Sequence, residues 1–74
     1  MNVSDKIEEL TELGYEVRCD IEEQYVILKV ADGDMSIEKM IPVEIVKHSK
    51  IDILSRELDR MRIDMEAARN EVNR

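Results

Sequence analysis

The stretch YEVRCDIEEQYVILKVADGDMSIEKMI, residues 15–41, decides the fold, because apolar and polar side chains alternate along much of it. In residues 15–21 every second side chain is apolar, which is the pattern of a strand with one buried face. Residues 25–31 are apolar enough for a central strand, and the Asp-Gly pair at 32–33 is a strong signal for a tight hairpin. Residues 35–41 can continue as a third strand, although the pattern leaves open whether that strand forms.

The turns set the expected pairing of these strands and the core between them. The expected cross-strand pairs are Val30 with Met35, Leu28 with Ile37 and Val26 with Ile21. The expected core consists of Val17, Cys19, Ile21, Val26, Leu28, Val30, Met35 and Ile37, covered by Ile7 and Leu10.

One helix is expected before these strands in the sequence and another after them. Apolar residues at helical spacing predict a short helix over residues 4–13, and Gly14 supplies its C-terminal stop. Pro42 suits the end of the sheet. The sequence therefore predicts an α+β chain with an acidic unit at 1–42, holding a short helix and a small antiparallel sheet of two or three strands. A long C-terminal helix follows at 43–74 in the same structural unit.

The long helix carries an unbroken heptad pattern, which is typical of a coiled coil. The a positions are Ile51, Leu58, Met65 and Val72, and the d positions are Leu54, Met61 and Ala68. Two points stay open: the helix can kink near His48, with Ser49 capping a restart, and its apolar seam can pack either on a partner or on its own sheet.

The charges beside the seam favour one orientation of a dimer. Glu57 and Asp64 occupy g positions, whereas Arg62 and Arg69 occupy e positions. In a parallel pair of helices these acids meet these bases across the interface, while an antiparallel pair sets acid against acid. Each exposed pair contributes only about 0.2–1 kcal/mol, so the charges select the orientation more than they stabilise it. The sequence predicts a parallel homodimeric coiled coil.

Size and composition point the same way. A chain of 74 residues buries a modest core and usually needs a disulfide, a metal or a partner. It has one Cys and one His, so neither an internal disulfide nor a usual metal site is expected. No arrangement of catalytic residues stands out, Cys19 is expected in the core, and no cofactor is expected. Self-association is the remaining means of stabilisation.

The net charge of −7 is unevenly distributed along the chain. Residues 1–38 hold 11 acids and 3 bases, whereas residues 39–74 hold 7 acids and 8 bases. Such a chain is not expected to bind nucleic acid or an anionic membrane directly. The acidic residues expected to form a partner-binding surface are Asp5, Glu8, Glu9, Glu12, Glu16, Asp20, Glu22, Glu23, Asp32 and Asp34.

Small size, acidity and its segregation into the front half make the chain resemble small phage-encoded DNA-mimic inhibitors, proteins that take over a host process. The opening MNVSDKIEEL…GYEV also looks like the start of some small acidic anti-CRISPR proteins. The resemblance implies a non-enzymatic inhibitor that occupies the basic groove of a host DNA-binding protein. Candidates are a nucleoid protein such as HU, or a restriction or CRISPR effector.

The alternative is a dimeric coiled-coil scaffold or adaptor, in which acidity serves only solubility and off-seam residues such as Ile53 and Ile63 contact the partner. Neither an apolar leader nor a membrane-spanning run is evident, and the single thiol suits a reducing compartment. A cytoplasmic location is expected, in the host cell if the protein is viral.

Overall fold

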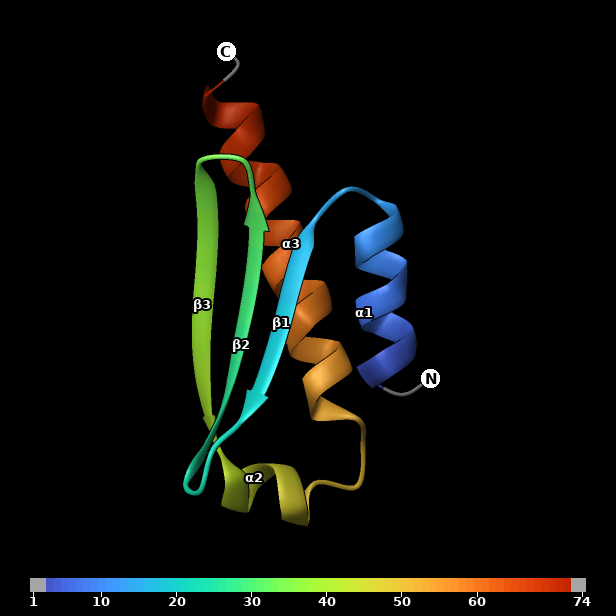
Figure 1. Ribbon diagram of the computed structural model, residues 1–74, viewed down its shortest axis with the longest axis vertical. Coiled ribbons are helices and arrows are strands. Elements are labelled where there is room, and N and C mark those ends of the chain that lie inside the picture. Colours follow the sequence, from blue (N-terminus) through green and yellow to red (C-terminus); the bar gives the residue numbers. More distant parts are fainter. Residues whose placement is uncertain (1–2, 73–74) are drawn as a thin grey trace.

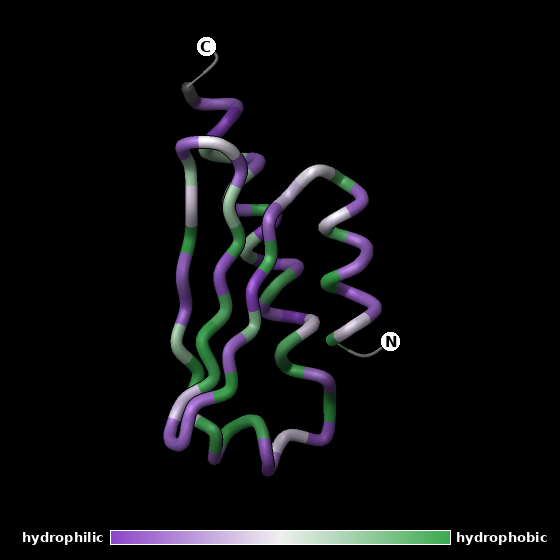
Figure 2. Tube along the Cα trace, in the orientation of Figure 1, coloured by the Kyte–Doolittle hydropathy of each residue, from purple (hydrophilic) through white to green (hydrophobic). Residues whose placement is uncertain are grey.

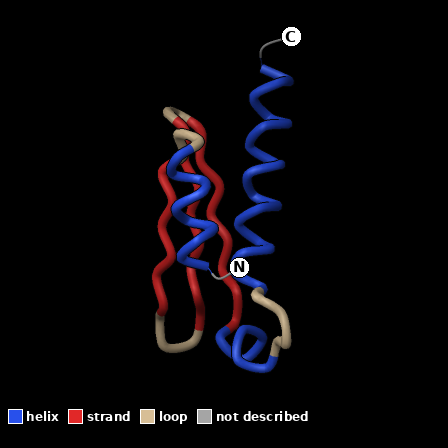
Figure 3. The backbone as a smooth tube through the Cα atoms, turned by 90° about the vertical axis from the view of Figure 1, so that its right-hand side faces the viewer, coloured by secondary structure: helices blue, strands red, loops and turns tan. Residues whose placement is uncertain are grey.

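The computed structural model describes residues 3–72, without the side chain of Val72, as a sheet with helices on one side. The elements in chain order are α1 (Val3–Glu12), β1 (Glu16–Ile21), β2 (Tyr25–Asp32), β3 (Met35–Pro42), α2 (Val43–His48) and α3 (Ile53–Val72). The strands form an antiparallel sheet in the order β1-β2-β3. α3 crosses one face of the sheet, and α1 lies beside β1 and α3 (Figures 1 and 3). The predicted α+β class is confirmed, and the third strand, which the sequence left open, forms.

The turn after α1 follows from Gly14, whose φ of 99° is cheap for glycine alone. The N–H of Tyr15 donates to the carbonyl of Leu10 at 3.1 Å, and the N–H of Gly14 donates to that of Thr11 at 3.0 Å. These two bonds define a Schellman motif, which usually brings together the side chains of its first and last residues. Leu10 and Tyr15 are accordingly both buried. The predicted helix is confirmed with an offset of one residue.

The β2–β3 hairpin is closed by Asp32 opposite Met35, with Gly33 at φ 63° in the first central position of the turn. Val30 therefore pairs with Ile37 rather than with Met35, and Leu28 with Lys39 rather than with Ile37. The predicted register was wrong by two residues, because the turn is centred one residue further along the chain than expected. An even shift keeps the same side chains on each face, and the predicted pair of Val26 with Ile21 is confirmed.

The core lies between the inner face of the sheet and the two longer helices. Its fully covered members are Leu10, Tyr15, Val26, Leu28, Val30, Ile41, Leu54, Leu58, Met61 and Met65, and among the predicted core residues Ile7, Val17, Cys19, Met35 and Ile37 are partly buried. Ile21 was wrongly assigned to the core, since it is 76% exposed at the end of β1, beyond the part that α1 covers (Figure 1).

The C-terminal segment is two helices, because residues 49–52 interrupt it. Asp52 caps α3: the N–H of Ser55 donates to Asp52 Oδ1 at 3.1 Å, and the Ser55 hydroxyl donates to Asp52 Oδ2 at 2.7 Å. The predicted cap, Ser49, instead donates from its hydroxyl to the carbonyl of Ile51 within the connection. The sequence left open whether the helix continues through His48; the structure breaks it there, and Asp52 rather than Ser49 caps the restart.

Truncation of the Leu58 side chain tests the packing of α3 against the sheet. Leu58 is fully buried, so Leu58→Ala is expected to lower the free energy of unfolding by about 2–5 kcal/mol, measured by urea titration. Ile63→Ala removes the same kind of group from the outer side of the same helix, where it is 50% exposed, and is expected to cost about 0.5 kcal/mol or less. Equal losses in the two variants would contradict this packing.

Candidate interaction surfaces

The seam of α3 is occupied by the sheet of the same chain. Leu54, Leu58, Met61 and Met65, which are four of the seven predicted seam residues, are 8%, 0%, 2% and 1% exposed in the single chain. Ala68 is partly buried, and the side chain of Val72 lies outside the described residues. Ile51 precedes the helix and is 54% exposed, so its assignment as the first a position was wrong.

The charges beside the seam also have partners within the chain. Lys39 and Asp32 extend from the inner face of the sheet, where Glu57 binds Lys39 and Arg69 binds Asp32. Arg69 also lies over the ring of Tyr15, with its Cζ 5.9 Å from the ring centroid. Arg62 binds acids on its own helix, Asp59 at 3.2 Å and Glu66 at 3.1 Å, and Asp64 is exposed.

These contacts bear on the predicted parallel coiled coil. A side chain packed at interior density against the sheet cannot fill a second interface at the same time. A coil through Leu54, Leu58, Met61 and Met65 therefore requires α3 to leave the sheet and expose Leu28 and Val30. A single chain does not test the dimer, which stays a prediction.

Eight of the ten acids predicted to bind a partner lie on adjacent elements, and we call this set the acidic flank. Its members are Asp5, Glu8, Glu9 and Glu12 of α1, Glu16 and Asp20 of β1, and Glu22 and Glu23 of the β1–β2 turn. All eight residues are exposed. α1 and β1, which carry six of the eight acids, run side by side (Figures 1 and 3).

Two of the predicted acids fall elsewhere. Asp32 and Asp34 belong to the β2–β3 hairpin, at the edge of the sheet away from α1. Asp32 is partly buried and bound to Arg69. The charge that Asp32 carries is therefore used to attach the hairpin to α3, and the sequence pattern did not distinguish this role.

Lys6 anchors the acidic flank to the core. Its Nζ lies 2.6 Å from Glu9 and 3.5 Å from Asp59 of α3, and its side chain is only 11% exposed. The hydrogen bond to Glu9 raises the pKa of Lys6 above its ordinary value of 10.5, although burial works in the opposite direction. This contact joins α1 to α3, and the other acidic residues of α1 are exposed.

A second candidate surface is apolar, and the sequence did not predict it. Ile21, Tyr25, Met40, Ile45 and Ile51 are between 40% and 76% exposed. They come from the end of β1, the start of β2, the end of β3, α2 and the α2–α3 connection, which share one end of the molecule (Figure 1). We call this set the apolar end. It escaped the sequence pattern because its members come from five different segments.

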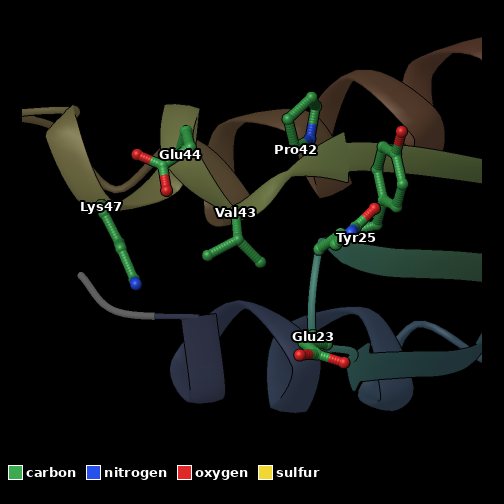
Figure 4. A pocket seen from close by; sticks show the side chains of 7 residues that line it. Glu23, Tyr25, Pro42, Val43, Glu44 and Lys47 are labelled. Carbon is green, nitrogen blue, oxygen red and sulfur yellow. The ribbon is translucent and has the colours of Figure 1, made fainter.

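Two pockets flank the junction of β3 and α2 at this end. One, of about 320 Å³, is lined by Tyr25, Pro42 and Val43, with Glu23 and Lys47 at its sides (Figure 4). The other, of about 250 Å³, is lined mainly by Met40, Ile41, Ile45 and Ile53, with the Lys39–Glu57 ion pair beside them.

The remaining reactive groups are dispersed. Burial, with a smaller effect of the Asp20 charge, raises the pKa of the Cys19 thiol, which disfavours the thiolate. His48 is exposed at the end of α2, with Nε2 3.2 Å from Glu44. Within residues 3–72 no three Asp, Glu, His or Cys side chains converge on a metal site, and no helix is long and apolar enough to cross a membrane.

Comparison with protein-family models, with curated proteins and with solved structures gave no match. The function of the protein is therefore inferred from its two candidate surfaces.

The Lys6 contact predicts a dependence on alkaline pH. A lysine whose pKa is raised by folding stabilises the protein fully below its unfolded-state pKa and loses that contribution as the pH rises through the folded-state pKa. The difference in unfolding free energy between the wild type and Lys6→Met should be constant from about pH 6 to 9 and should shift against the wild type above pH 10.5. Urea titrations at each pH measure it, and a constant difference up to about pH 11.5 would contradict the contact.

Proposed function

We propose that this protein is a non-enzymatic inhibitor that binds a basic, DNA-binding host protein through the acidic flank. The supporting observation is the gathering of eight exposed carboxylates on α1, β1 and the turn that follows. A nucleoid protein such as HU, or a restriction or CRISPR effector, presents the basic groove that such a surface fits. The acidic protein would occupy the place of the DNA phosphates.

The spacing of the flank supports charge mimicry. Carboxylates three or four residues apart on a helix have Cβ atoms about 5–6 Å apart, and alternate residues of a strand are about 6.7 Å apart. Both distances are of the order of neighbouring phosphates along a nucleic-acid strand. The Schellman turn and the Lys6 contact hold α1 against the rest of the fold, so the array is ordered before it binds.

Opposite charge on the flank limits its extent. Arg18 lies between Glu16 and Asp20 on the outer face of β1. Because Asp32 and Asp34 lie on the far hairpin, we confine the mimicry to the eight residues of the flank.

Displacement of a labelled duplex from purified HU tests the proposal, with restriction and CRISPR effectors as further probes. We expect the wild type to release the duplex, measured by fluorescence anisotropy, and Glu8→Lys/Glu12→Lys/Asp20→Lys to lose at least tenfold in potency. The loss follows from reversing three charges that face the basic groove, and the effect should weaken steeply with salt because surface attraction is screened within about 8–10 Å.

The matched control reverses three exposed acids outside the flank, Asp34→Lys/Glu38→Lys/Asp64→Lys. Its net charge equals that of the first variant, so a general effect of charge would reduce both potencies equally. The proposal fails if the two variants lose potency alike, or if the wild type displaces DNA from none of the probes.

The exposed apolar end favours a second candidate function, an adaptor whose acidity serves solubility. The predicted coiled-coil scaffold is one form of it. Partner binding by such an adaptor would survive the reversal of Glu8, Glu12 and Asp20 and would change little with salt.

A further inference from the structure

The apolar end concentrates the apolar side chains that the described fold leaves uncovered. Within residues 3–72, seven large apolar residues are exposed, and five of them form the apolar end. Its green segments lie around α2 and the nearby strand ends in Figure 2. By the strand register Ile21 lies on the helix-facing side of the sheet and Tyr25 and Met40 on the other side, so the set surrounds the end of the sheet. Single exposed apolar side chains are ordinary, whereas several gathered at one end mark an interaction site.

The accessible surface area of the single chain exceeds the average for a folded monomer of its mass. Its accessible surface is 5427 Å², whereas folded monomers of 8.7 kDa average roughly 4,700 Å². The excess of about 700 Å² is close to the roughly 800 Å² that each partner buries in an interface of standard size. One dimer contact would remove an area of this size, and the exposed side chains of the apolar end supply part of the excess.

The shape and charge of the end suit a second copy. Protruding side chains such as Ile45 lie beside two pockets, and a twofold contact needs such complementary features on one surface. Glu22 and Glu23 lie on the turn at one side, while Lys47 and Lys50 lie on α2 and just after it. Because these opposite charges border the same end, this end is less uniformly acidic than the flank and a second copy can approach it.

We propose that the apolar end is a homodimer interface, covered by a second copy of the chain about a twofold axis. This dimer uses none of the buried seam of α3, so each chain keeps its own core. It also leaves the carboxylates of α1 uncovered, and it does not depend on the proposed inhibitory function.

Sedimentation velocity between about 1 and 300 µM tests the interface. We expect the wild type to dimerise within this range, and Ile45→Glu to raise the dissociation constant at least tenfold, because it places a charge in an apolar contact. The control, Ile63→Glu, changes a residue of equal exposure, 50% against 49%, on the outer side of α3 and should leave the dissociation constant unchanged.

Circular dichroism separates loss of the dimer from loss of the fold. Ile45 and Ile63 are both half exposed, so both variants should retain the helical spectrum of the wild type. Ile51→Glu, in the α2–α3 connection, is a second variant of the apolar end and should also dissociate the dimer. A monomeric wild type throughout the range, or a dimer lost in Ile63→Glu but kept in Ile45→Glu and Ile51→Glu, would overturn the proposal.

Salt distinguishes this contact from partner binding by the acidic flank. Two chains of charge −7 repel each other, so raising NaCl from about 50 to 500 mM should leave the dimer unchanged or strengthen it. Displacement of DNA from HU should weaken over the same range. A dimer that dissociates as salt rises would count against an apolar interface, whatever the outcome with HU.

Discussion

The contact between one side of α3 and the inner face of the sheet is the interaction on which the rest of the structure depends. Leu58 and Met65 are fully buried there together with Leu28 and Val30. In a chain of 74 residues this is most of the available core, since α2 contributes no fully buried side chain. Because the apolar side of α3 is used within the chain, an association that leaves this core intact must draw on other surfaces.

The ion pairs follow the same geometry. Lys39 and Asp32 extend from the inner face of the sheet to Glu57 and Arg69 of α3, and Lys6 connects α1 to Asp59. In these contacts the basic side chains join one element of the fold to another. Arg62 instead binds acids of its own helix. The eight acids of the flank stay exposed while Lys39, Arg62 and Arg69 bind acids elsewhere in the fold, which is the physical basis for proposing that the flank meets a basic partner.

The two surfaces differ in chemistry and in position. The acidic flank would act through long-range attraction that salt weakens, whereas the apolar end would act through removal of apolar area from water. They meet near the β1–β2 turn, where Glu22 and Glu23 belong to the flank and also border the apolar end. A dimer joined at this end would carry two acidic flanks on one particle, and avidity would then strengthen binding to a dimeric or repeated basic partner.

The sequence by itself determined the order and type of most elements, because alternation, the glycines and the proline act over a few residues. It left open the third strand and the break in the C-terminal helix. Local pattern also identified all eight acids of the acidic flank, since solvation of a carboxylate needs no knowledge of the fold. Tertiary structure alone decided where the seam of α3 is buried, since a 3-4 spacing over three heptads describes the same apolar stripe whether it meets a partner or a sheet. It likewise decided that Asp32 binds Arg69, that Ile21 is exposed, and that five separate segments meet in one apolar end. Each depends on distances between residues far apart in the chain, which packing sets and periodicity does not encode.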